Sequence, residues 1–204
     1  ISPRRLGKSG LLHHTFAQTR IIEGYIPIYI DIYATKNLTE FAKTLAEGII
    51  RGVRAEEGWT EKVMRFLKSL RVGFKVDPMT GSTSFEIGIG DIEDPDKTIR
   101  EAFEYIENCG KPCILAIDEF QQIREYPETN TEAFIRTLVQ QCSKTRFIFC
   151  GSKRHMMTDI FYSPSKPLFQ GVINRGLKPI PMDTYIEFAG RLFAERGKFI
   201  EKFT

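Results

Sequence analysis

The sequence lacks any long hydrophobic run, and no stretch of about 18 consecutive apolar residues occurs among its 204 positions. No transmembrane helix is therefore expected, and no basic segment followed by an apolar one opens the chain as a secretory signal would. Strong charge is also missing, because 29 Lys and Arg against 26 Asp and Glu leave a formal net charge of +3. So small an excess does not by itself indicate a nucleic-acid partner or an anionic membrane surface.

Cysteine is scarce, and its spacing does not suit a metal site. The four cysteines form no C-x-x-C pair and no histidine lies at a ligand spacing from them, so a zinc site is not expected. Cys113 and Cys150 lie inside apolar runs, where cysteine behaves as a small hydrophobic residue. We therefore expect reduced core thiols in a cytoplasmic protein.

Apolar strands and amphipathic helices alternate along most of the chain. The strands are predicted at residues 25–33, 113–117, 146–152 and 177–182. The helices are predicted at residues 10–20, 37–53, 60–70, 95–110, 132–142 and 183–199. Because buried strands alternate with helices, the sequence predicts an α/β fold with a parallel sheet between helical layers.

An insert is predicted at about residues 55–95. Within it, residues 71–90 place apolar side chains at alternate positions on two arms, with turn residues at 77–81 between them, which predicts a β-hairpin. An isolated hairpin is marginal in water, so its apolar side chains must pack on another surface. The helix at 60–70 and a neighbouring subunit or regulatory domain are both open as that surface. The side chains concerned are Phe74, Val76, Phe85 and Ile87.

Gly7-Lys8-Ser9 matches the end of a phosphate-binding P-loop, G-x-x-x-x-G-K-[ST]. A glycine lets the backbone approach a phosphate, and a lysine at this place brings positive charge to the β- and γ-phosphates. The helix that follows adds its positive end. The match fails at one position, where Ser2 replaces the first glycine. The predicted nucleotide-binding residues are Ser2, Pro3, Arg4, Arg5, Leu6, Gly7, Lys8, Ser9 and Gly10.

Asp118 and Glu119 follow the apolar strand CILAI, so they stand at its carboxyl end, where α/β sheets bind their ligands. In P-loop ATPases an aspartate at this place holds Mg²⁺ together with the loop hydroxyl, which here is Ser9. The glutamate beside it polarises the attacking water. An isolated Asp-Glu pair would more often cap a strand, but the order of the two motifs on predicted strands favours a nucleotide site.

Ser152 ends the next predicted strand, RFIFCGS. A polar residue there could contact the γ-phosphate or the attacking water, and a simple turn before the following helix explains it equally well. Asp31, at the end of YIPIYID, is interpreted as a strand-end hydrogen-bonding residue.

The chain resembles the prokaryotic P-loop ATPases of the AAA/STAND-related archaeal-type ATPase family in four segments: SPRRLGKSGLL, YIPIYIDIYATKNL, CILAIDEFQQI and FIFCGSKRHMMTDIF. The resemblance implies a three-layer ASCE-type sandwich with sheet order 5-1-4-3-2, and ATP with Mg²⁺ as ligands. It identifies Lys8 with the Walker A lysine, Ser9 and Asp118 as the metal-binding residues, and Glu119 as the Walker B catalytic base. Ser152 corresponds to the sensor position.

The resemblance also implies how the chain is divided and what it does. Residues 1–182 would form the ATPase core, with its first strand largely missing, and residues 183–204 would begin a helical lid region. The core would act as a nucleotide-dependent switch for attached domains, such as a winged-helix or other regulatory domain. A homo-oligomer stays open, and nothing in this domain indicates nucleic acid or membrane. A small-molecule kinase and a non-hydrolytic nucleotide-binding module remain the alternatives.

Overall fold

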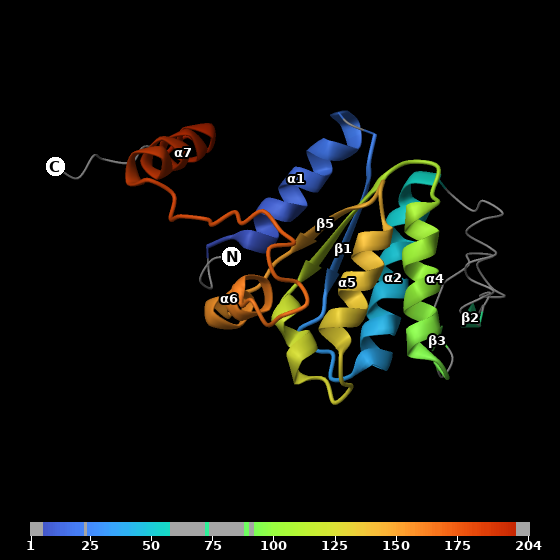
Figure 1. Ribbon diagram of the computed structural model, residues 1–204. Coiled ribbons are helices and arrows are strands. Elements are labelled where there is room, and N and C mark those ends of the chain that lie inside the picture. Colours follow the sequence, from blue (N-terminus) through green and yellow to red (C-terminus); the bar gives the residue numbers. More distant parts are fainter. Residues whose placement is uncertain (1–5, 23, 58–71, 74–87, 90–91, 199–204) are drawn as a thin grey trace.

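A computed structural model describes residues 6–22, 24–57, 72–73, 88–89 and 92–198 of the chain (Figure 1). Its centre is a parallel sheet of three strands in the order β1-β4-β5, formed by Ile26–Asp31, Cys113–Asp118 and Arg146–Phe149. The register pairs Ile26 with Cys113 and Asp31 with Asp118, so β1 and β4 end at the same level. These three strands and their parallel direction confirm the predicted α/β class.

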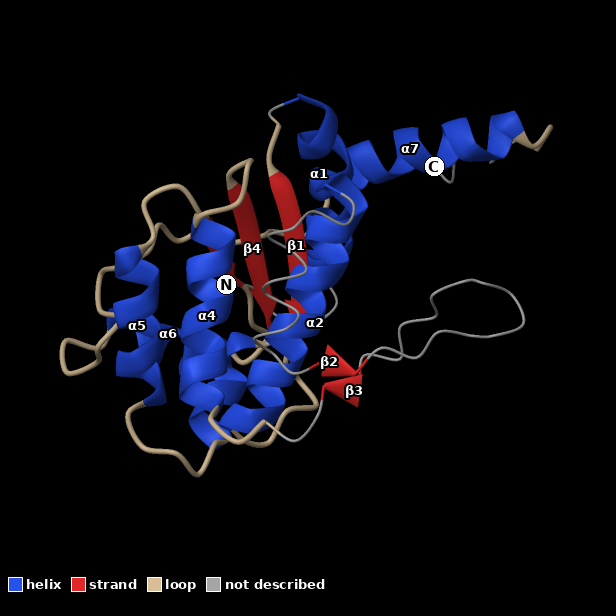
Figure 2. Cartoon of the chain, turned by 90° about the vertical axis from the view of Figure 1, so that its right-hand side faces the viewer, coloured by secondary structure: helices blue, strands red, loops and turns tan. Residues whose placement is uncertain are grey.

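Helices cover both faces of this sheet (Figures 1 and 2). Helix α1, Lys8–Ile22, lies on one face and packs Leu12 and Phe16 against Ala116. Helices α2 (Leu38–Glu57), α4 (Pro95–Glu107) and α5 (Thr131–Gln141) lie on the other face. Alternation along the strands explains the two layers, because neighbouring residues point to opposite faces. The isoleucines of β1 face α2, whereas Tyr29 faces α1.

Helix α2 begins with a capping arrangement and buries an apolar face. The Asn37 Oδ1 accepts the Glu40 backbone N–H at 2.9 Å, and the Glu40 carboxylate reaches back to the Lys36 N–H at 2.8 Å. Both bonds satisfy amide groups that a helix start leaves unpaired. The apolar face is almost fully buried against β1 and α4, and it consists of Leu38, Phe41, Leu45, Ile49 and Val53.

Two glycines of α2 allow this helix to lie unusually close to β1. A Cβ atom at Gly48 would overlap the Ile30 Cγ2 methyl group, and one at Gly52 would lie 2.8 Å from Ile28 Cγ1. The two positions are one helical turn apart, so they face the same strand. The backbone of α2 therefore occupies the space where side chains would stand in an ordinary helix–sheet contact.

The loop between α5 and β5 is held by one carboxylate on α4. Glu107 accepts hydrogen bonds from the backbone N–H groups of Ser143, Lys144 and Thr145 at 2.7–3.0 Å, and from the Ser143 hydroxyl at 2.8 Å. Desolvation acts to raise the pKa of Glu107, but the hydrogen bonds outweigh it and lower this pKa to about 2.

We expect the Glu107→Gln variant to be less stable than the wild type at neutral pH. The pKa of Glu107 is lowered on folding, so its contribution is present above the unfolded value of about 4.5 and is lost as the pH falls towards 2. Chemical denaturation at pH 7 and pH 4 measures this effect. The stability difference between wild type and variant should shrink at the lower pH, and a difference independent of pH would contradict the assignment.

The structure differs from the prediction in two segments. Residues 177–182 form no strand, because Pro179 and Pro181 lack the N–H groups that a sheet ladder needs and no strand lies beside them in the described residues. Residues 120–125, for which no element is predicted, form a 3-10 helix, η1 (Phe120–Glu125). Helix α6 (Arg154–Tyr162) comes later, after β5.

The insert lies mostly outside the described residues, and so do the helix predicted at 60–70 and the four hairpin side chains named above. The structure pairs β2 (Val72–Gly73) with β3 (Gly88–Ile89) in the antiparallel direction. This pairing agrees with two hairpin arms, while the hairpin itself stays a prediction.

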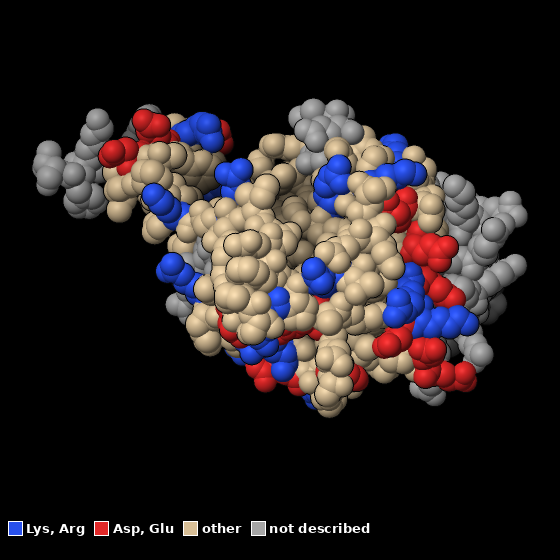
Figure 3. All heavy atoms as spheres, in the orientation of Figure 1, with Lys and Arg blue, Asp and Glu red and all other residues tan. Residues whose placement is uncertain are grey.

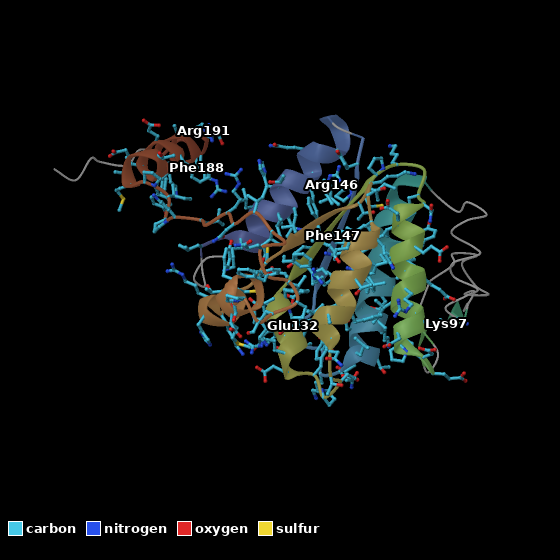
Figure 4. All side chains as sticks on the ribbon, in the orientation of Figure 1. Lys97, Glu132, Arg146, Phe147, Phe188 and Arg191 are labelled. Atoms are coloured by element: carbon cyan, nitrogen blue, oxygen red, sulfur yellow. The ribbon has the colours of Figure 1, made fainter. Side chains whose placement is uncertain are left out.

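Helix α7, Met182–Glu195, forms where an amphipathic helix is predicted, but its apolar side is not covered. Figure 1 shows it projecting from the body of the molecule, and its described residues bury none of their side chains. Phe188 and Arg191 lie side by side on this helix, with the guanidinium 5.6 Å from the ring centroid (Figure 4). No helix in the described residues is long and apolar enough to cross a membrane.

Candidate functional site

The amino end of α1 forms one wall of the candidate site. Gly7 has a φ of +74°, a left-handed conformation that favours glycine, and its carbonyl accepts the Leu11 N–H at 2.8 Å. The turn at Gly7 therefore starts the helix at Lys8 and directs its first N–H groups towards the carboxyl end of the sheet. Lys8 and Ser9 are half-buried there. The loop residues Ser2, Pro3, Arg4 and Arg5 lie outside the described residues.

Asp118 ends β4 and is only 3% exposed. Its Oδ2 accepts hydrogen bonds from the Ser9 hydroxyl at 2.6 Å and from the Tyr29 hydroxyl at 3.0 Å. Its Oδ1 accepts the backbone N–H of Glu119 at 2.9 Å. Ser9 and Asp118 are 109 positions apart in the chain and are in direct contact, as expected from the order of the two motifs on the predicted strands.

Tyr29 belongs to the site although the sequence pattern does not identify it. It lies on β1 opposite Ala116, on the face covered by α1, and its ring lies 4.5 Å from that of His13. Burial raises the pKa of Tyr29, and the nearby Asp118 carboxylate raises it further, so the phenol stays protonated and donates. Only the register of β1 against β4 reveals this contact.

Glu119 has a left-handed backbone, with φ 54° and ψ 38°. The carbonyl of Cys150, just beyond the end of β5, accepts the Phe120 N–H at 2.8 Å and so holds the chain after Glu119 in place. The Glu119 Oε2 accepts hydrogen bonds from the Ser152 hydroxyl at 2.8 Å and from the Gln121 side-chain amide. A non-glycine residue in this conformation is strained, and such strain is frequent at functional sites.

A pocket of about 400 Å³ joins these groups at the carboxyl end of the sheet. Asp31 contributes to it from the end of β1, where its Oδ1 accepts the Tyr33 N–H at 2.8 Å, and Ser152 contributes from beyond β5. The pocket is lined by Gly7, Lys8, Ser9, Gly10, Asp31, Tyr33, Glu119 and Ser152. Backbone amides, one lysine, hydroxyls and carboxylates therefore face one space.

A second cavity of about 590 Å³ lies between α1, β5 and the segment that follows α6. Apolar side chains of β5 and Val172 and Ile173 form much of its lining. In Figure 3 residues other than Lys, Arg, Asp and Glu cover the middle of the face in view, which is hollowed there. The Cys150 thiol in its lining is not a reactive thiolate, because burial and then the Asp118 charge raise the pKa of this thiol to about 11.

The donor set suits a hard cation. Mg²⁺ prefers oxygen ligands and is usually held by one or two protein groups together with water and substrate phosphates. The Ser9 hydroxyl and the Asp118 carboxylate are oxygen donors already in contact with each other. In the described residues no three His, Cys, Asp or Glu side chains converge as a self-sufficient metal cage. The site therefore fits an ion that arrives with a ligand of its own.

No protein-family model matches the chain. No curated protein matches it either. Among solved structures, the chain is similar to the Walker-type ATPase PABY2304 of Pyrococcus abyssi, with a TM-score of 0.64, 22% identity, and coverage of 98% of this chain and 53% of that one. It is also similar to the ORC1 protein of Aeropyrum pernix, solved in complex with DNA, with a TM-score of 0.50, 13% identity, and coverage of 99% and 44%. The chain thus spans about half the length of these proteins. The fold is similar to that of the Walker-type ATPase.

Proposed function

We propose that this chain is the core of an ATPase that binds Mg-ATP, hydrolyses it, and acts as a nucleotide-dependent switch for attached domains. The observation that carries the proposal is the 2.6 Å hydrogen bond between Ser9 and Asp118. It brings the end of a P-loop motif and the end of an apolar strand to one pocket, in a fold similar to that of P-loop ATPases. This arrangement is the one phosphoryl-transfer sites use.

Nucleotide phosphates would bind against the amino end of α1. The left-handed turn at Gly7 exposes the first N–H groups of the helix, which have no partner within the helix and attract anions. Lys8 lines the same pocket and would neutralise the β- and γ-phosphates. The predicted residues Ser2 to Leu6 would complete this cradle.

Ser9 and Asp118 would hold Mg²⁺, which supplies positive charge against the phosphate oxygens when it is bound. Tyr29 contributes a hydrogen bond that holds the buried Asp118 carboxylate in place beside Ser9. Glu119 would take the proton of the attacking water, and Ser152, bonded to the same carboxylate, would report on the γ-phosphate. These roles follow the predicted assignments of Glu119, Lys8 and Ser152.

The finer architecture belongs to the same proposal. The strands β1, β4 and β5 would be strands 2, 3 and 4 of the predicted order 5-1-4-3-2, in which strand 3 also lies between strands 2 and 4. In that order the strand that precedes the phosphate loop lies along β5, where the larger cavity is found. Residues 1–182 would form the core and 183–204 the start of a lid, in the cytoplasm of a prokaryote. The proposed partner is a regulatory domain, whereas nucleic acid is a second option suggested by the DNA-bound ORC1 protein.

Phosphate release from the full-length protein tests this function. We expect release from ATP that requires Mg²⁺ and stops when EDTA removes the ion, because Ser9 and Asp118 are the proposed metal ligands. Chromatography of the products distinguishes the alternatives. A phosphorylated small molecule instead of free phosphate would indicate a kinase, and nucleotide binding without any product would indicate a non-hydrolytic module.

A further inference from the structure

Gln121 is a buried polar residue that the assignments above leave without a role. It lies on η1, two residues after Glu119, and is only 1% exposed. Its Nε2 donates a hydrogen bond to the Glu119 Oε2. Its Oε1 is also buried and accepts no hydrogen bond in the described part of the chain. The amide cannot be turned round, because a carboxylate accepts hydrogen bonds and would repel the amide oxygen.

A buried amide oxygen without a donor destabilises a protein, so packing alone does not explain a glutamine here. An apolar side chain of similar length, such as methionine, would fill this space without an unpaired atom. What glutamine adds is a charge-assisted hydrogen bond to the Glu119 carboxylate, which is stronger than a neutral one. The presence of glutamine at this buried position therefore indicates that its role is to bind the Glu119 carboxylate.

The end of β5 makes room for the same amide. A Cβ atom at Gly151 would overlap the Gln121 Oε1 and lie 2.6 Å from the Met157 Sδ. Gly151 is buried, and Ser152, which also binds the Glu119 Oε2, follows directly. Residues from two strand ends and α6 thus enclose the Gln121 amide and fix it against Glu119.

We propose that Gln121 is a positioning residue for ATP hydrolysis, which holds the Glu119 carboxylate in the orientation needed to activate water. This inference rests on the proposed function. The backbone of Glu119 is already fixed by the Phe120–Cys150 hydrogen bond, so its side-chain torsions are the freedom that remains. Gln121 and Ser152 both donate hydrogen bonds to Oε2, and Oε1 would accept the water proton. Gln121 acts from the buried side, whereas Ser152 acts from the pocket.

The Gln121→Met variant of the full-length protein tests the role, because it keeps the length of the side chain and removes both polar atoms. We expect kcat to fall by about tenfold or more, part of the contribution usual for a general base, with KM and nucleotide affinity within about twofold of wild type. Gln121→Asn, which stays polar but is too short to reach Glu119, should give the same result. It also serves if the methionine variant does not fold.

The matched control is Gln122→Met, on the same short helix. Gln122 is half-buried, and its side-chain amide donates to the Thr35 carbonyl at 3.1 Å, whereas its backbone N–H donates to the Glu119 carbonyl at 2.9 Å and is kept in the variant. Its kcat should stay near that of the wild type, and melting temperatures measured for all variants separate lost catalysis from lost folding. Steady-state and single-turnover phosphate release provide kcat, KM and the rate of the chemical step.

The outcomes separate the role of Gln121 from the proposed function. An active wild type with a Gln121→Met variant that matches the Gln122→Met control in kcat would overturn the role and leave the function intact. A raised KM with unchanged kcat would also overturn it, because it indicates binding and not positioning of the base. A wild type that releases no phosphate with any Mg-ATP concentration would overturn the proposed function itself, and the role with it.

Discussion

The Glu119→Gln variant of the full-length protein is expected to lose ATP turnover by about 10²–10⁴-fold, the usual contribution of a general base. Nucleotide binding should remain, because the amide keeps the size of the side chain and the phosphate-binding residues are unchanged. Phosphate release measures the first effect and fluorescent-nucleotide titration the second. The amide can still accept the Ser152 and Gln121 hydrogen bonds through its oxygen, so the fold of the site is preserved.

Glu125→Gln is the matched control for this substitution. Glu125 is an exposed carboxylate on η1, 3.8 Å from the Lys153 ammonium, and it lines no described pocket. Its removal should change turnover by less than about twofold, since an exposed ion pair contributes little. Normal hydrolysis by the Glu119→Gln variant would show that another group activates water.

The second large effect is expected at Gly48. The Gly48→Ala variant should lower the free energy of unfolding by about 1–3 kcal/mol, because its new methyl group would overlap Ile30 in a close-packed contact. The overlapped atom is a branched methyl group of a buried strand residue, so it cannot swing aside as the end of a long side chain could. Urea denaturation of wild type and variant measures the difference.

The Gly190→Ala variant is the matched control, with the same substitution at a position that has room for it. Gly190 lies within α7, and a Cβ atom there would meet nothing within 4 Å. In a helix, alanine is more stable than glycine by about 0.5–1 kcal/mol, because it loses less conformational entropy on folding. The control variant should therefore be neutral or slightly stabilised. Equal destabilisation by both substitutions would contradict the close contact between α2 and β1.

Much of the fold could be predicted from the sequence because its elements have strong local patterns. The buried strand CILAI, the alternation in IPIYID and the apolar face of α2 each specify type and orientation without knowledge of the rest. The strand expected at 177–182 was wrong because its apolar residues alternate with prolines, which a sheet accepts only at an edge. The 3-10 helix η1 was not expected, since the Phe120 N–H at its start is held by the carbonyl of Cys150, which lies 30 residues further along the chain, just beyond β5.

The site could be predicted in part. Strand ends in a parallel sheet meet at one edge, so motif order alone brings Ser9 and Asp118 together. Tyr29 and Gln121 could not be found this way. The first depends on the register of β1 against β4, and the second depends on a turn that folds a glutamine back onto its neighbour. Contacts that depend on a strand register or on the shape of a turn leave no short motif in the sequence.

The strands β1 and β4 end at the same level, and this affects which form of the nucleotide can enter the pocket. The register places Asp31 level with Asp118, and Glu119 follows directly. Two carboxylates, Asp31 and Glu119, therefore line a pocket whose described lining has one lysine, and the buried Asp118 carboxylate lies against Ser9 beside it. Negative charges this close repel an approaching polyphosphate, in contrast to the basic funnels that many anion sites present. Within the proposed function, free ATP would be disfavoured at this pocket, and a nucleotide that brings its own divalent cation would be selected at the moment of entry.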